Sequence, residues 1–103
     1  MDKLLFQVDV RSRARLLDTL REQHPERAAL GEVSFGFYVD DDARHVGYVL
    51  LEWESLKSAQ AFLQSPKSHE LVAEWPIEKV LSATALRDIQ QQAARIEGAA
   101  SDA

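Results

Sequence analysis

Four segments of the sequence have the composition and alternation of β-strands, and this pattern limits the fold more than any other feature. They are residues 4–10, 32–39, 45–53 and 77–86. Two further segments, 11–23 and 55–75, repeat apolar residues every three or four positions, as helices do. The order is therefore strand, helix, strand, strand, helix, strand. It predicts an α+β domain with a ferredoxin-like split βαβ fold (βαββαβ) and a four-stranded antiparallel sheet.

The boundaries of the first helix follow from its capping residues and from a proline. Ser12 is the expected N-cap. Because the residue before a proline disfavours helical geometry, the helix should end at His24. Helical character then resumes over residues 26–30 before Gly31 closes it.

Two serines organise the second helical segment. Ser55 is the expected cap of a helix over residues 56–64. Ser65 restarts the helix, with Pro66 in the first helical position, and the apolar face continues to Trp75. The helical spacing then recurs near the C-terminus and predicts an extra short helix there, through Leu86, Ile89, Ala93 and Ile96. We expect one domain over residues 1–97 and a frayed polar tail over 98–103.

Composition and charge exclude several classes of protein. Apolar residues make up 46% of the 103 residues and charged residues 28%, as in ordinary globular domains. The net charge of −5 argues against nucleic-acid binding. No apolar run reaches the ~20 residues of a membrane span, and the start of the chain has no signal peptide, so we expect a cytoplasmic protein. With no cysteine and no paired histidines, we expect no structural metal.

The predicted strands carry apolar residues on both faces, which a single layer of helices cannot cover. A second copy of the chain is the simplest cover, since two-fold dimers are the commonest oligomers. The sequence therefore predicts a homodimer that pairs through its sheet faces. The neighbouring pairs that carry this argument are Leu5 and Phe6, Phe37 and Tyr38, and Leu50 and Leu51.

Part of the sequence resembles a known superfamily. The residues concerned are 52–55 (Glu-Trp-Glu-Ser), 59–63 (Ala-Gln-Ala-Phe-Leu), the Ser65-Pro66 break and the helix to Trp75. This stretch is similar to the dimeric α+β-barrel superfamily, and nearest to the antibiotic biosynthesis monooxygenase-like domains. The resemblance implies a small cofactor-free monooxygenase acting on a flat aromatic or polyketide-like molecule.

Two alternatives to this function stay open. One is a non-catalytic dimeric module that binds a small apolar or aromatic ligand or another protein. The other is an isomerase or lyase of the muconolactone isomerase type. Haem-degrading and quinone-forming members of the superfamily carry an asparagine on the first strand, whereas this chain has no asparagine and offers Gln7 there. This difference favours the non-catalytic module.

The candidate site combines bases, hydrogen-bond donors and aromatic walls. His69 and Asp9 are the candidate bases, and Gln7 and Tyr48 are the candidate donors. Trp53, Phe62 and Trp75 are the candidate walls of the substrate site. Each has a plainer interpretation, which is the commoner outcome. His69 is then an exposed helix residue, Asp9 is paired at a strand end, and the aromatic residues belong to the core.

A pocket, if present, should lie between the helices and the sheet, since the other sheet face is used by the dimer. Because side chains alternate along a strand, only one face of the first strand can point toward the helices. If Gln7 and Asp9 point there, the pocket has polar chemistry. If Phe6 points there, the site is an apolar core or a passive ligand site. His45 with Asp40 and Asp42 is interpreted as a solvated hairpin tip rather than a cation site.

Overall fold

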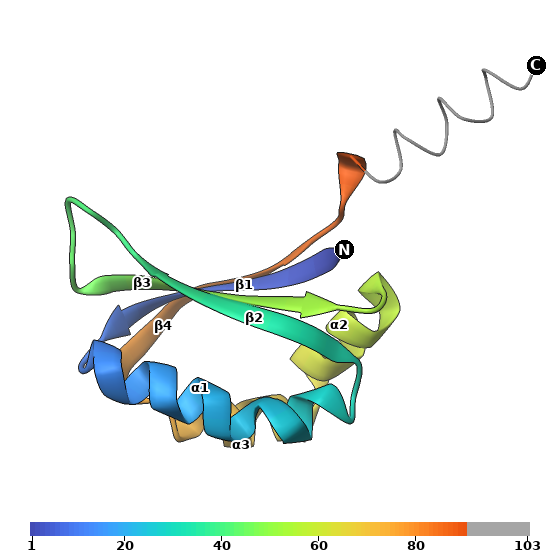
Figure 1. Ribbon diagram of the computed structural model, residues 1–103, viewed down its shortest axis with the longest axis horizontal. Coiled ribbons are helices and arrows are strands. Elements are labelled where there is room, and N and C mark those ends of the chain that lie inside the picture. The colour runs from blue at the N-terminus through green and yellow to red at the C-terminus, as the bar shows by residue number, and fades with distance from the viewer. Residues whose placement is uncertain (91–103) are drawn as a thin grey trace, which may run out of the picture.

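A computed structural model, which describes residues 1–90, confirms the ferredoxin-like α+β class (Figure 1). The elements in chain order are β1 (Asp2–Val10), α1 (Arg13–Ala28), β2 (Glu32–Val39), β3 (Val46–Trp53), α2 (Leu56–Gln64), α3 (Pro66–Ala73) and β4 (Ile77–Leu86). The helix expected near the C-terminus falls largely outside the described residues, as do the expected domain end at residue 97 and the tail 98–103. None of the described helices is long and apolar enough to cross a membrane.

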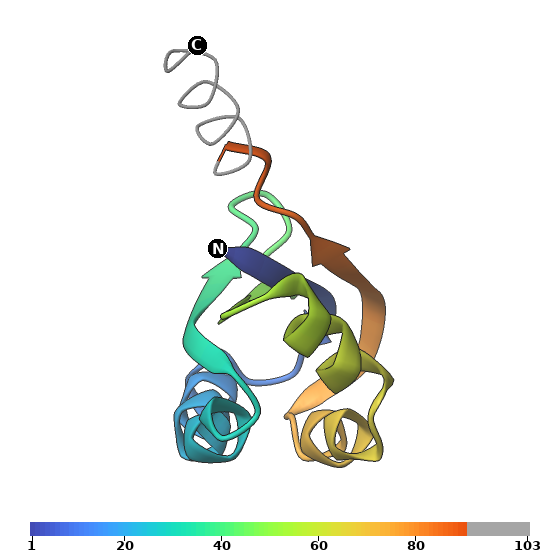
Figure 2. The same cartoon turned by 90° about the vertical axis from the view of Figure 1, so that its right-hand side faces the viewer.

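The four strands form one antiparallel sheet in the order β2-β3-β1-β4. All three helices lie on one face of this sheet, and the opposite face is uncovered by the described residues (Figures 1 and 2). α1 lies under the β2 side, and α3 lies beside it under the β4 side (Figure 2). The sheet therefore has a helix-covered face and an open face, and alternate side chains of each strand point to one face or the other.

The pleat of β1 points Leu4, Phe6 and Val8 toward the helices, where they are 0%, 3% and 0% exposed. Their neighbours Leu5, Gln7 and Asp9 point to the open face and are half-buried. Side chains from β3 and the helices complete the core, and each large apolar side chain fully buried there contributes about 1.5–3 kcal/mol. The buried core residues are Leu4, Phe6, Val8, Leu16, Leu20, Val49, Leu51, Trp53, Ala59, Phe62, Leu71 and Trp75.

The first helix corrects one expectation from the sequence. α1 does not end at His24 but continues without a break to Ala28, with Pro25 inside it. A proline in a helix removes one backbone hydrogen bond and leaves the carbonyl four residues earlier without its partner. Here that carbonyl belongs to Arg21, an exposed residue. The turn beyond Pro25 is also held by Arg27, whose buried side chain bonds to neighbouring groups.

The break in the second helical segment is confirmed. α2 ends at Gln64 and α3 begins at Pro66, with Ser65 as the C-cap of the first and the N-cap of the second. The Ser65 hydroxyl donates to the Phe62 carbonyl oxygen (2.7 Å) and accepts a bond from the Ser68 backbone N–H (3.2 Å). α3 is shorter than expected and stops at Ala73 rather than Trp75. The two bonds of the Ser65 hydroxyl fix the direction in which α3 leaves α2.

Candidate functional site

A cleft of about 380 Å³ opens between α2 and α3 on one side and strands β1 and β4 on the other. It lies between the helices and the sheet, where the sequence led us to expect a pocket. Its walls are mainly apolar, which suits a ligand with an apolar body. Strand β4 contributes Val80 and Ala83 to the lining, and the β2–β3 hairpin contributes no residue. The lining residues are Phe6, Leu63, Ser68, His69, Val72, Ala73, Val80 and Ala83.

The aromatic wall of the cleft is Phe6, and Trp75 stands behind it. The two rings meet edge to face, with centroids 5.2 Å apart and planes at 78°. Trp75 Nε1 donates to Gln23 Oε1 on α1 at 2.9 Å, and Gln23 Nε2 donates to the Leu71 carbonyl oxygen at 2.9 Å. Gln23 is itself buried. α1 therefore fixes the orientation of Trp75, which the sequence had placed directly in the wall.

Ser68 is a lining residue that the sequence reasoning missed. It is 3% exposed, and its backbone N–H is bonded to Ser65 Oγ. Its hydroxyl forms no hydrogen bond with any group in residues 1–90. One signal could have found it: Ser68 stands three, four and seven residues before Leu71, Val72 and Trp75. A serine in that apolar stripe is a polar group directed at the sheet.

His69 is the one titratable side chain among the residues that line the cleft. It is exposed on α3, and no group in residues 1–90 hydrogen-bonds to its ring. An imidazole that is free of protein partners can exchange protons both with solvent and with a bound molecule. The position of His69 thus fits a general base at the mouth of the cleft.

Gln7, Asp9 and Tyr48 lie on the open face of the sheet and do not converge with His69. Gln7 pairs with Tyr48 across β1 and β3, and Ser82 Oγ donates to Gln7 Oε1 at 3.4 Å. The Tyr48 hydroxyl donates to Asp40 Oδ2 at 3.4 Å. The sheet itself separates all three from the cleft. The structure therefore matches the second of the two strand directions considered above, with Phe6 facing the helices.

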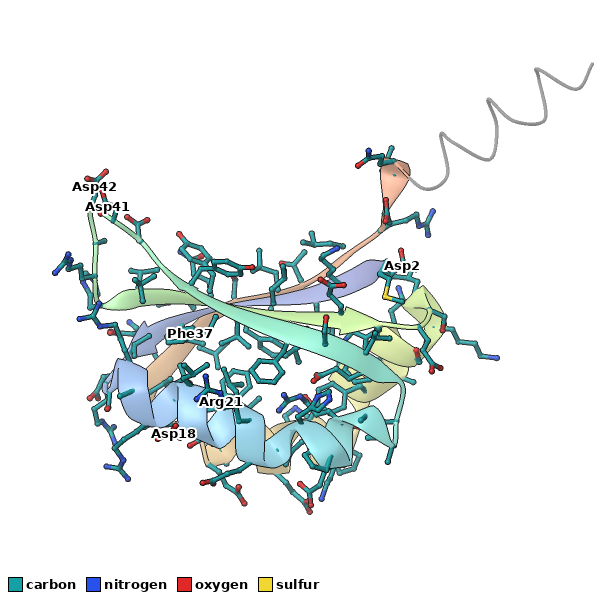
Figure 3. The ribbon with its side chains drawn as sticks, viewed as in Figure 1. Asp2, Asp18, Arg21, Phe37, Asp41 and Asp42 are labelled. Carbon is teal, nitrogen blue, oxygen red and sulfur yellow. The ribbon has the colours of Figure 1, made fainter. Side chains whose placement is uncertain are left out.

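Trp53 and Phe62 belong to the core and do not line the cleft. Their rings pack 4.9 Å apart at 33°. Within residues 1–90, the buried Trp53 Nε1 has no hydrogen-bond partner. Phe37, on β2, points toward α1 on the covered face (Figure 3). β2 and β4 are the two edge strands of the sheet, so Phe37 lies at the opposite edge of the sheet from the cleft at β4. The aromatic residues are thus divided among the core and one wall of the cleft.

The acidic turn between β2 and β3 is a separate feature. Asp41 and Asp42 stand at its tip, away from the helices (Figure 3). Asp40 Oδ1 accepts bonds from the Ala43 and Asp42 backbone N–H groups at 3.0 and 2.8 Å. These two bonds lower the pKa of the Asp40 carboxyl below its usual value, with smaller help from Tyr48 and His45. Within residues 1–90, no three His, Asp or Glu side chains gather in a way that could hold a metal ion.

No family model matches the chain, and no curated protein sequence matches it. Its fold does match solved structures. A proposed antibiotic biosynthesis monooxygenase from Bordetella bronchiseptica is 12% identical, with a TM-score of 0.68 over 84% of this chain and 95% of that chain. One from Chloroflexus aurantiacus is 18% identical, with a TM-score of 0.60 over 84% and 91% of the two chains.

A conserved protein from Methanosarcina mazei Go1 is also similar, at 14% identity and a TM-score of 0.60, over 84% of this chain and 91% of that chain. At such identities the likeness concerns the fold. It confirms, at that level, the resemblance to antibiotic biosynthesis monooxygenase-like domains that the sequence indicated.

Proposed function

We propose that the protein is a small monooxygenase-like enzyme that binds a flat aromatic or polyketide-like molecule in the cleft and needs no cofactor. The observation that carries this proposal is the apolar cleft with a single titratable side chain, His69, at its mouth. The likeness in fold to proposed antibiotic biosynthesis monooxygenases supports it. We expect the reaction to take place in the cytoplasm.

In the proposed reaction, the cleft orients the substrate and His69 removes a proton from an acidic ring methylene. The carbanion that forms adds to molecular oxygen and gives a hydroperoxide on the same carbon. Loss of water then leaves a carbonyl group. One oxygen atom of O₂ ends in the product and the other in water, and the substrate itself supplies all the electrons.

The open face of the sheet supports a homodimer as the working form. It presents Leu5 and Leu50, both half-buried, and Tyr38, which is 59% exposed. Leu86 on β4 is 37% exposed and belongs to the same face. Such an apolar surface is more stable when it is covered. In this arrangement Gln7 and Tyr48 lie in the interface between two copies, and the two clefts face outward.

The second candidate function is a non-catalytic module that binds a small apolar ligand. It is favoured by the position of Gln7, Asp9 and Tyr48, because only Ser68 and His69 remain to supply polar chemistry in the cleft. The isomerase or lyase alternative would use the same cleft and the same histidine, without oxygen.

Oxygen uptake with anthrone, a flat three-ring ketone with an acidic methylene, tests these functions. The monooxygenase should consume one O₂ for each anthraquinone formed, faster than the spontaneous reaction. Loss of a general base typically costs about 10²–10⁴-fold in rate, so His69→Ala should lower turnover by that order. His45→Ala, at the exposed hairpin, is the matched control and should leave turnover unchanged.

The other outcomes separate the alternatives. Binding of anthrone without oxygen uptake would support the ligand-binding module. Proton exchange at the methylene without oxygen uptake would support the isomerase or lyase. Undiminished turnover in His69→Ala would remove this histidine from the mechanism.

A further inference from the structure

One polar group on the wall of the cleft has no partner within the described protein. Ser68 lines the cleft, is 3% exposed, and its hydroxyl makes no hydrogen bond with residues 1–90. The fully buried unbonded side-chain atoms of the described residues are Arg27 Nη1 and Trp53 Nε1, so the Ser68 oxygen, although its residue is largely buried, is still reached from the cleft. A hydroxyl in that position is open to a bond with water or with a ligand. The other lining residues, apart from His69 at the mouth, have only carbon in their side chains.

We propose that the Ser68 hydroxyl is the anchor for a single oxygen atom of the ligand. The cleft then selects neutral ring compounds that carry one hydrogen-bonding oxygen next to an apolar body, such as a phenol or a ring ketone. This inference rests on the proposed function, because it concerns the same cleft, and it narrows the class of ligand that the cleft accepts.

The position of Ser68 is fixed before any ligand arrives. Its backbone N–H donates to Ser65 Oγ at 3.2 Å, and the Ser65 hydroxyl in turn donates to the Phe62 carbonyl oxygen at 2.7 Å. The hydroxyl of Ser68 itself takes no part in this capping. A hydrogen-bonding group that is already held in place loses little entropy on binding, which favours selectivity.

The charges around the cleft argue against an anionic ligand. No lysine or arginine is among the residues that line it. The cation nearest in sequence, Lys67, is paired with Glu26 at 3.3 Å and with Glu70 at 3.6 Å. A carboxylate transferred into these apolar walls would lose its hydration without gaining a counter-ion from them. A ligand with several hydroxyl groups would likewise leave most of them unbonded.

A matched pair of two-ring compounds tests the role of Ser68. 1-Naphthol carries one hydroxyl, and 1-methylnaphthalene has a methyl group in its place. Binding of each would be followed at pH 8 by the Trp75 indole N–H resonance, since Trp75 packs against the cleft residue Phe6. One hydrogen bond changes affinity by about three- to tenfold. Ser68→Ala should therefore lower the affinity for 1-naphthol by that factor and leave the affinity for 1-methylnaphthalene unchanged.

Three controls complete the experiment. Ser82→Ala, on the open face, should leave both affinities as they are. The urea midpoint of Ser68→Ala should match that of the unsubstituted protein, because the capping bond uses the backbone of Ser68. 1-Naphthoate should bind more weakly than 1-naphthol.

Each other result overturns something specific. Equal weakening of both compounds by Ser68→Ala would mean that Ser68 acts through packing. If Ser68→Ala lowers the affinity for neither compound, the ligand oxygen binds elsewhere. If 1-naphthoate binds more tightly than 1-naphthol, the cleft does not select neutral compounds. In these cases the proposed function stands and only the inference fails. If neither naphthalene compound shifts the Trp75 resonance of the unsubstituted protein, the binding cleft itself fails, and both proposals fall together.

Discussion

Arg27 and Glu32 form an ion pair inside the protein, with side chains that are 1% and 0% exposed. The pair joins the last turn of α1 to the first residue of β2. The Arg27 Nη2 group also donates to the Leu20 carbonyl oxygen at 2.9 Å. His24 Nδ1 lies 2.7 Å from the other carboxylate oxygen of Glu32. The chain thus closes the corner between helix and sheet with charged groups rather than with apolar side chains.

Glu32→Gln should destabilise the protein by about 3–5 kcal/mol, because it leaves the Arg27 charge buried without its counter-ion. Urea unfolding followed by circular dichroism measures the change. The double variant Arg27→Met with Glu32→Leu should recover most of the loss, since a well-packed apolar pair can replace a buried ion pair. Glu54→Gln, at an exposed position, is the control. A loss below 1 kcal/mol for Glu32→Gln would show that the pair contributes little.

Gln23→Leu should destabilise the protein by about 1–3 kcal/mol while keeping the side-chain volume similar. The substitution removes the acceptor for Trp75 Nε1, which is then left unbonded, and one of the two donors to the Leu71 carbonyl, which keeps its bond from the Glu74 backbone N–H. The indole N–H resonance of Trp75 should move, whereas that of Trp53, which has no partner within residues 1–90, should stay in place. Movement of both resonances would indicate a wider rearrangement of the core.

The acidic turn should respond to pH through Asp40. The Ala43 and Asp42 backbone N–H groups hold the pKa of this carboxyl below its usual value in the folded protein. A carboxyl with a lowered folded pKa stabilises the fold above its unfolded pKa, and this contribution is lost as pH falls through the folded value.

A carbon-13 NMR titration should therefore give a lower midpoint for Asp40 in the native protein than in the urea-unfolded chain. Asp40→Asn should remove this part of the acid sensitivity of stability. Equal midpoints in the two states would contradict the expected pKa shift.

Leu50→Lys should disrupt the proposed dimer, because it places a charge in the middle of the open sheet face. Sedimentation at micromolar concentration should give about twice 11.6 kDa for the unsubstituted protein and 11.6 kDa for the variant. Lys57→Glu, on the exposed side of α2, should leave the mass unchanged. A compact monomer in the unsubstituted protein would refute the dimer.

Most of the fold could be predicted from local patterns. The alternation of β1 and the capping serines Ser55 and Ser65 gave element bounds that agree with the structure to within a residue or two. The end of α1 could not be predicted in this way. The local preference of the residue before Pro25 was outweighed by tertiary contacts: Gln23 bonds to the distant α3, and Arg27 pairs with Glu32 at the start of β2.

The site was harder to predict than the fold, because β1 is apolar on both faces. Leu5 and Phe6 are equally suited to a core, so alternation alone cannot say which of them faces the helices. The role of Ser68 depends on the absence of a bonding partner, which no sequence pattern reveals. His69 was selected by residue type, and its place at the mouth of the cleft depends on how α3 is placed opposite β1 and β4, which the sequence does not reveal.

The shared cap at Ser65 has a consequence for which molecules can enter. Leu63 precedes this residue and Ser68 follows it, and both line the cleft. Both residues belong to the helix side of the cleft, and β1 and β4 form the other side. A ligand that turned α3 away from α2 would break the bond between the Ser68 backbone N–H and the Ser65 hydroxyl. The shared cap therefore holds the helix side of the cleft in one shape. A bulky saturated ligand that needs a wider angle between α2 and α3 would bind only at the cost of this capping bond, whereas a ligand that fits the existing angle leaves it intact.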